Sequence, residues 1–175
     1  MENIKKKALI IVDVQPAFVK ENSSFVIPAI VELIKNVPYD LYIESLFHAE
    51  KNSLWNKQTD WVCPKDENFY TVPEITELLK DKNYVKVEKE TKSVFKGNPN
   101  ILSILKEKGI EEIHIVGCDT DDCVLATAYE SFDLGFFTYV IEECTASSSK
   151  HKEVRDCALR ILKRVGILKK VDQIK

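Results

Sequence analysis

The segment EIHIVGCDTDDCVLATAYESFDLG, residues 112–135, contains one complete strand–loop–helix unit. Its first part, residues 112–117, is a short apolar run typical of a buried strand. Three aspartates and a threonine, residues 119–122, then precede the first apolar residues of helical period, and the expected helix covers 121–134 and ends at Gly135. The segment therefore predicts a strand followed at once by a capped helix, with Cys123 in the first helical turn.

The same alternation of short β-like runs and amphipathic helical segments continues along the chain. Strands are expected at 8–14, 40–46, 84–89, 112–117 and 136–143, with a last edge strand at 171–174. Helices are expected at 27–35, 72–80, 100–108, 121–134 and 152–165. This order predicts an α/β fold: a three-layer α-β-α, Rossmann-like arrangement with a mainly parallel sheet of about six strands and helices on both faces.

Length, composition and charge limit the classes of function. The chain has 175 residues, 45% of them hydrophobic, which suits one domain over residues 1–175. A formal net charge of −3 offers no basic field for nucleic acid or an anionic membrane. No apolar run approaches the roughly 20 residues of a membrane span. Asp13 interrupts the apolar run after the basic N-terminus and no cleavage site follows, so we expect a cytoplasmic protein.

The cysteines do not form a disulfide or metal pattern. Their number is odd and no C-x-x-C pair occurs; the five are Cys63, Cys118, Cys123, Cys144 and Cys157. In a reducing compartment most such cysteines are small buried hydrophobic residues.

Polar residues follow several of the expected strands. Asp13, His48, Lys89 and the loop 118–123 stand at the ends of the first, second, third and fourth strands. Ligands bind beyond the carboxyl ends of the strands in such sheets. Each residue alone has an ordinary explanation, as a turn aspartate, a surface imidazole or one lysine among many. Their joint placement predicts a functional site.

Cys123 is the candidate nucleophile of this site. The dipole and unpaired N–H groups of a helix start stabilise a thiolate, and they could also stabilise the oxyanion of a tetrahedral intermediate. The neighbouring aspartates raise a thiol pKa, so a nearby cation is needed, and Lys89 is the candidate. The chain contains no G-x-S-x-G, G-x-G-x-x-G or Walker motif.

Three motifs resemble those of the isochorismatase-like cysteine hydrolases, a family that includes nicotinamidases and N-carbamoyl amidohydrolases. The pattern D-x-Q-x-x-F is matched by residues 13–18, K-x-x-x-S-x-F by residues 89–95, and G-x-x-T-[DE]-x-C-V-x-x-T-A by residues 117–128. They occur in the family's order and span about two thirds of the chain.

The resemblance implies a catalytic triad of Asp13, Lys89 and Cys123. Asp13 would act as general base and later donate the proton to the leaving amine, and Lys89 would hold Asp13 and stabilise the thiolate. It also implies a cis peptide between Cys118 and Asp119, which turns the Asp119 N–H toward the oxyanion beside that of Cys123. The implied reaction is hydrolysis of a small-molecule amide, ureido or carbamoyl C–N bond through a thioester, without a cofactor.

The chain departs from the metal-binding members of this family. The nicotinamidase pattern D-x-H-x-x-x-H falls on Leu46, His48 and Asn52, so one ligand of three remains. A single imidazole does not make a transition-metal site, and we predict no metal and doubt nicotinamidase activity. Isochorismatase proper cleaves a vinyl ether without a nucleophilic cysteine, so Cys123 argues against that reaction.

Substrate contacts and partners are less defined by the sequence. Phe18, His48 and Phe95 are candidate substrate-binding residues, and His48 is as well explained as an inert residue. The long aromatic segment 48–70, with neighbouring Phe47, is expected to wall the pocket or an oligomer interface through Phe47, Trp55, Trp61 and Tyr70. The resemblance implies a homo-oligomer, a dimer or tetramer, acting on a small-molecule substrate.

Two alternatives to the hydrolase stay open. One is a non-catalytic relative that binds a small molecule or a partner with the same fold. The other is a redox protein in which Cys123 acts as a sensor or forms a transient disulfide with Cys118.

Overall fold

Six strands form one sheet in the computed structural model, which describes residues 5–174; residues 1–4 and 175 of the expected domain lie outside the described residues. The strand order is β3-β2-β1-β4-β5-β6, and every neighbouring pair is parallel. The strands are β1 (Lys7–Val12), β2 (Leu41–Phe47), β3 (Tyr84–Lys89), β4 (Glu112–Cys118), β5 (Phe137–Ala146) and β6 (Leu168–Lys169). The predicted six-stranded parallel sheet is confirmed.

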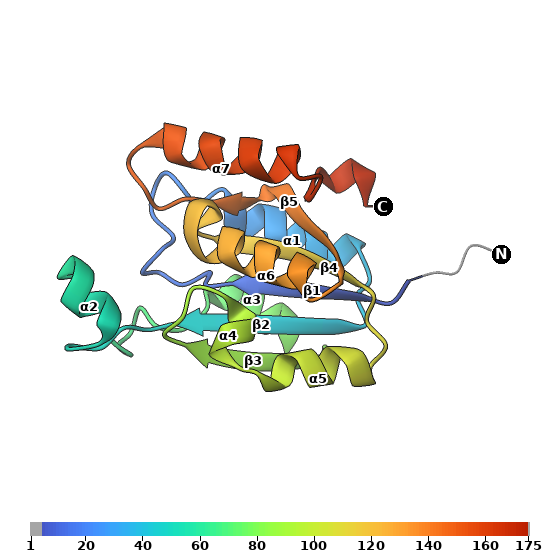
Figure 1. The fold of residues 1–175 in the computed structure, drawn as a ribbon, viewed down its shortest axis with the longest axis horizontal. Coiled ribbons are helices and arrows are strands. Elements are labelled where there is room, and N and C mark those ends of the chain that lie inside the picture. Colours follow the sequence, from blue (N-terminus) through green and yellow to red (C-terminus); the bar gives the residue numbers. More distant parts are fainter. Residues whose placement is uncertain (1–4, 175) are drawn as a thin grey trace.

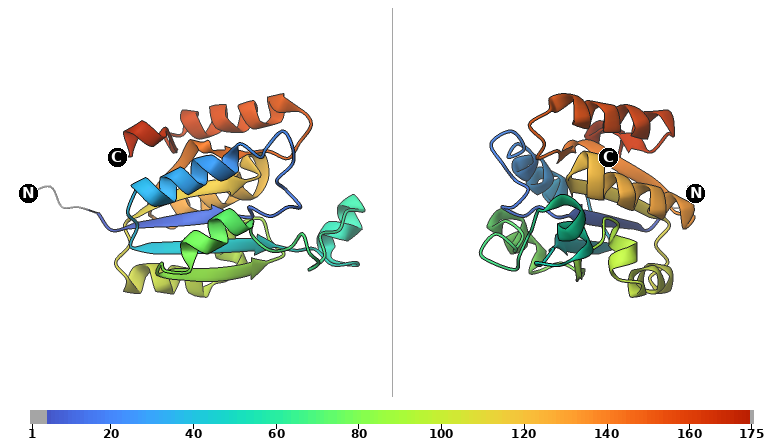
Figure 2. Two further views of the ribbon diagram at one scale, coloured as in Figure 1. Left: turned by 180° about the vertical axis from the view of Figure 1, so that it is seen from behind. Right: turned by 60° about the vertical axis from the view of Figure 1, so that its left-hand side comes forward.

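Helices cover both faces of this sheet (Figures 1 and 2). One face carries α1 (Val26–Asn36) and α3 (Pro73–Leu79). The other carries α4 (Val94–Gly97), α5 (Asn100–Glu107) and α6 (Leu125–Asp133), while α7 (Lys152–Arg164) packs beside the β5–β6 edge. Alternate residues of β1 point into the two cores, with Ala8 and Ile10 on one side and Leu9 and Ile11 on the other. This is the expected three-layer arrangement. Within residues 5–174, no helix is long and apolar enough to cross a lipid bilayer.

The short helix α2 (Leu54–Thr59) stands apart from these layers. It belongs to the aromatic segment 48–70 and projects beyond the carboxyl ends of β2 and β3 (Figure 1). An isolated bridge between Ala49 and Cys63 closes the base of this excursion. The segment is therefore an ordered loop at the edge of the sheet where a ligand site is expected.

The expected edge strand at 171–174 is wrong. The last strand is β6, which ends at Lys169, two residues before the expected start. Val171–Gln173 form a 3-10 turn. After β6 the backbone closes on itself, because Gln173 N–H donates to the carbonyl of Lys170 and Ile174 N–H to that of Val171. These local bonds use groups that a strand would offer to β5.

Gly117 brings the end of β4 against β1. Its φ of 112° lies in the region that favours glycine, and a Cβ there would lie 2.1 Å from the carbonyl oxygen of Val12. The pairing of β4 with β5 is also irregular between Ile115 and Gly117. This close approach places the loop after β4 next to Asp13, which follows Val12.

Candidate active site

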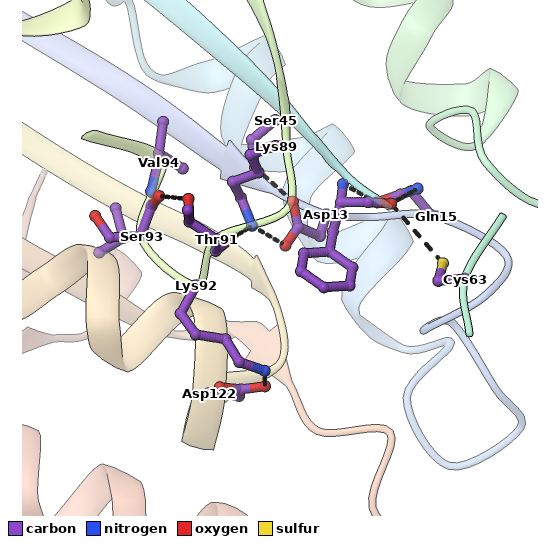
Figure 3. A network of polar contacts seen from close by, with 12 residues as sticks. Asp13, Gln15, Ser45, Cys63, Lys89, Thr91, Lys92, Ser93, Val94 and Asp122 are labelled. Carbon is purple, nitrogen blue, oxygen red and sulfur yellow. Dashed lines mark hydrogen bonds and ion pairs between the residues drawn. The ribbon is translucent and has the colours of Figure 1, made fainter. Parts of the chain in front are cut away.

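Asp13 and Lys89 form an ion pair at the carboxyl ends of β1 and β3. Lys89 Nζ lies 2.7 Å from Asp13 Oδ2, and both side chains are almost completely buried. Asp13 has a φ of 48°, a left-handed conformation that aspartate adopts more readily than most residues. The two residues, here called the catalytic pair, are brought together as the order of strand ends predicts (Figure 3).

The remaining polar atoms of the catalytic pair are also satisfied. Ser45 Oγ donates to Asp13 Oδ1 at 2.6 Å, and Lys89 Nζ donates to the carbonyl of Thr91 at 3.0 Å. Burial lowers the pKa of Lys89, but attraction to Asp13 and Cys123 outweighs it and raises the pKa above its ordinary value. Lys89 is therefore charged at neutral pH, and it offsets the buried charge of Asp13.

Cys123 lies in a π-helical turn, Thr120–Val124, between β4 and α6. Thr120 anchors this turn, because its hydroxyl bonds the hydroxyl of Thr145 at 2.8 Å and Thr145 in turn donates to the carbonyl of Gly117. The expected helix start is present, but no side chain caps it. The carboxylate of Asp119, the residue before the turn, accepts hydrogen bonds from Ser148 instead.

The electrostatic setting of Cys123 differs from the sequence prediction. Burial and the negative charge of Asp13 raise the pKa of its thiol well above the ordinary value, although Lys89 lowers it. These effects oppose the activation of the thiol that the helix start predicts. Because burial and Asp13 favour the protonated form of Cys123, its attack on an electrophile calls for a base that takes its proton.

Cys123 opens into a cavity of about 310 Å³. The lining residues are Ala17, Phe18, Lys20, Phe47, Trp55, Trp61, Lys92, Asp119, Asp122, Cys123 and Ser148. Four of them, Phe18, Phe47, Trp55 and Trp61, form what we call the aromatic wall, with ring centroids 6.0–6.2 Å apart. A cavity of this size admits only a small molecule.

Gln15 holds the base of the aromatic wall. Its buried side chain donates to the carbonyls of Phe47 and Phe69 and accepts from the N–H of Phe47. Gln15 is the second fixed position of the first sequence motif. Its role is to join the segment after β1 to both ends of the aromatic excursion.

Asp119 lines the same cavity as Cys123, and the peptide bond between Cys118 and Asp119 is cis. Ser148 donates both its N–H and its hydroxyl to the Asp119 carboxylate, at 2.8 and 2.6 Å. Burial nevertheless raises the pKa of Asp119 to about 6, because these donors are neutral and Asp121 and Asp122 are nearby. Asp119 and Cys123, whose N–H groups the resemblance assigns to the oxyanion, both line the cavity.

Three sequence-predicted contacts are not at the cavity. Phe95 is buried and stacks on Phe136, with ring centroids 6.4 Å apart, and it does not line the cavity, so the structure gives its assignment to substrate binding no support. His48 packs its ring edge-on against Phe69, and its Nδ1 lies 3.4 Å from Glu90 Oε1. Tyr70 is 63% exposed and does not line the cavity. Phe18, in contrast, lies in the wall.

The residues at the nicotinamidase metal position do not fit a metal. Leu46 is an apolar buried residue, and Asn52 is exposed in a turn with a φ of 70°. Among residues 5–174, no group of three or more histidine, cysteine, aspartate or glutamate side chains could hold a metal ion. His48 alone cannot supply the required donor set.

Cys118 and Cys123 point away from each other. Cys118 belongs to the core on the α1 and α3 face of the sheet, and Cys123 belongs to the core on the other face. All five cysteines are free. This placement gives no support to a disulfide between Cys118 and Cys123, one of the two forms of the redox alternative.

The fold and this site define a class of protein: a parallel α/β protein with a thiol in a small cavity and a buried carboxylate–ammonium pair at the ends of the strands. Residues 7–170 match the model of the isochorismatase domain. The chain therefore belongs to the isochorismatase family of hydrolases.

Similar proteins agree with this assignment. An uncharacterized isochorismatase family protein, YrdC, from Bacillus subtilis strain 168 is 33% identical over 153 residues, covering 82% of this chain and 75% of that protein. An isochorismatase-like hydrolase from Alkaliphilus metalliredigens has a similar structure, with a TM-score of 0.79, 20% identity and coverage of 98% and 96% of the two chains. The Bacillus subtilis nicotinamidase PncA gives a TM-score of 0.76 at 23% identity, covering 94% of this chain and 99% of that one. At these identities the two structures show the shared fold.

Proposed function

We propose that this protein hydrolyses a C–N bond of a small amide, ureido or carbamoyl compound, with Cys123 as nucleophile and a thioester as intermediate. The observation that carries the proposal is the position of the catalytic pair. It lies at the carboxyl ends of β1 and β3, the same edge of the sheet at which the turn with Cys123 follows β4, and Cys123 lines a cavity of about 310 Å³. A nucleophile beside an oriented base is the arrangement that covalent catalysis requires.

The first half of the reaction needs a base because burial and Asp13 favour the protonated thiol of Cys123. The Asp13 carboxylate takes the proton of Cys123 as the sulfur forms a bond to the substrate carbonyl carbon. The carbonyl oxygen becomes an oxyanion, which the N–H groups of Asp119 and Cys123 stabilise. Lys89 keeps Asp13 oriented and balances the negative charge that moves onto the sulfur.

The second half returns the enzyme to its starting state. The protonated Asp13 gives its proton to the leaving nitrogen as the C–N bond breaks, which releases ammonia or an amine and leaves an acyl group on Cys123. Asp13 then takes a proton from water, whose oxygen attacks the thioester carbon. The acid product leaves, and the proton returns to the Cys123 sulfur.

Removing the nucleophile tests the proposal. The wild type, Cys123→Ala and Cys157→Ala would be assayed for ammonia or amine release from a panel of small amides, ureido acids and carbamoyl amino acids. We expect the wild type and Cys157→Ala to hydrolyse at least one member equally well and Cys123→Ala to lose the activity. Cys157 is the matched control because it is an exposed free thiol on α7.

Trapping the intermediate gives a second measurement. Acid quenching during turnover should leave an acyl adduct on Cys123 that mass spectrometry detects. If no member of the panel is hydrolysed, or Cys123→Ala retains full activity, the proposal fails and the alternative of a non-catalytic binding protein is favoured.

A further inference from the structure

Lys92 stands between three parts of the active site without being a fixed position of any family motif. It follows Lys89 by three residues, and its ammonium group forms an ion pair with Asp122, the neighbour of Cys123 (Figure 3). The same group lies 3.2 Å from the ring centroid of Trp55 and 5.7 Å from that of Phe47. Lys92 therefore joins the segment after β3, the nucleophile turn and the aromatic wall.

We propose that Lys92 is a positioning residue of this site: it keeps Trp55 and the nucleophile turn in place, and its charge favours the anionic sulfur of Cys123. For hydrolysis this inference rests on the proposed function. The part that concerns the reactivity of the thiol does not, and it can be tested without a substrate.

The charges around Cys123 explain why a second cation matters. Asp13 and Asp122 oppose ionisation of the thiol, whereas Lys89 and Lys92 favour it. Lys89 is already paired with Asp13, so its charge is largely used to hold the base. Lys92 forms an ion pair with Asp122 and so offsets the effect of that carboxylate on the thiol.

The packing of Lys92 indicates more than a solvated surface ion pair. Its side chain is 30% exposed and its ammonium group lies over an indole face. An ammonium group over tryptophan contributes about 0.5–2 kcal/mol, depending on desolvation. Because α2 has no buried residues of its own, this contact is one of the few that hold the excursion over the cavity.

Alkylation of Cys123 by iodoacetamide measures the proposed charge effect. The sulfur forms a bond to the reagent's methylene carbon, iodide leaves, and the thiol proton passes to Asp13 or solvent. We expect Lys92→Met to slow this reaction about tenfold at neutral pH and Asp122→Asn to accelerate it. Peptide mass spectrometry at Cys123 separates this signal from that of the exposed Cys157.

Changes of opposite sign in the alkylation rates of Lys92→Met and Asp122→Asn distinguish a charge effect from a structural one. If the Lys92–Asp122 pair were only a cross-link, both substitutions would loosen the turn and change the rate in the same direction. That result, or no change in either variant, would overturn the proposal. Lys92→Arg should stay close to wild type, and Lys96→Met is the matched control because Lys96 is an exposed lysine of the same segment. Asp122→Asn remains informative even if Lys92→Met fails to fold.

A kinetic measurement then tests the positioning of the wall. On any panel compound that the wild type hydrolyses, Lys92→Met should raise KM and lower kcat, while Lys96→Met should change neither. Unchanged KM would show that Lys92 does not hold the wall. If the panel contains no substrate but the alkylation rates change with opposite signs, the proposed function fails and the charge effect of Lys92 stands.

Discussion

Two regions of the candidate site differ in how they are built. The catalytic pair is fully buried, and each of its charged groups has a partner on a neighbouring strand end or loop. The aromatic wall comes mainly from the excursion 48–70, and Trp61 within it is 38% exposed. It is held by ring contacts, by Gln15 at its base and by Lys92 over Trp55.

This difference predicts that the catalytic pair determines the rate of the reaction and that the aromatic wall determines which substrates bind. Buried charges must keep their partners, because an uncompensated charge in the interior costs several kcal/mol. A partly exposed wall of rings tolerates changes of shape, since each contact contributes about 0.5–1.5 kcal/mol. Substitutions in the catalytic pair should therefore change stability and activity together, and substitutions in the wall should mainly change substrate affinity.

Lys89→Met is expected to have the largest effect. It leaves the Asp13 carboxylate buried beside the Ser45 hydroxyl and without its cation, so the free energy of unfolding should fall by about 3–5 kcal/mol. Hydrolysis should be lost as well. Urea denaturation measures the first effect, and the double variant Asp13→Asn/Lys89→Met is the control.

The double variant should recover part of the lost stability, because no unpaired charge remains, yet it should stay inactive. If it unfolds as easily as Lys89→Met alone, the ion pair is not what stabilises the base of the cavity. The difference in stability expected between the catalytic pair and the aromatic wall would then not come from compensation of a buried charge.

The catalytic pair was predictable because it depends on topology. The expected strand 84–89 agrees with β3 residue for residue, and the rule that parallel strands end at one edge places Asp13 beside Lys89. Ser45 was missed, although it pairs with Val12 in register and is thus adjacent to Asp13. A polar residue in a buried strand was the available signal.

The structure differs from the sequence predictions where the burial and the direction of a side chain determine its environment. Sequence spacing places Cys123 at a helix start but does not show how far burial and Asp13 raise its pKa. Phe95 occupies a motif position, but its ring points into the core against Phe136. The wall depends on contacts such as Lys92 with Trp55, between segments far apart in the chain, which no local period encodes.

Asp119→Asn tests a carboxylate that lies between the two regions. Its effect on the free energy of unfolding should be smaller than that of Lys89→Met and larger than that of Trp61→Ala. Its folded-state pKa of about 6 exceeds the ordinary 3.8, so folding favours the protonated form. That stabilisation is fully present below about pH 4 and is lost as the pH rises through about 6. The wild type should therefore lose about 2 kcal/mol relative to the variant over this range, allowing for partial exposure.

Urea denaturation of both proteins from pH 4 to pH 8 measures this difference. It should grow up to about pH 7 and then stay constant. A difference that does not vary with pH would mean that Ser148 and solvent compensate the Asp119 charge fully. Asp119 would then resemble the well-compensated Asp13.

Trp61→Ala should have the smallest effect on stability and a clear effect on binding. Trp61 stacks on Phe47 and contacts Phe18, but it is partly exposed, so the free energy of unfolding should fall by only about 1 kcal/mol. KM should rise several-fold with kcat little changed, because the wall contributes to binding and not to proton transfer. Tyr70→Ala is the control, since Tyr70 is a neighbouring aromatic outside the cavity. A fall in kcat as large as the rise in KM would show that the wall positions the reacting carbonyl, and the division between chemistry and selectivity would not hold.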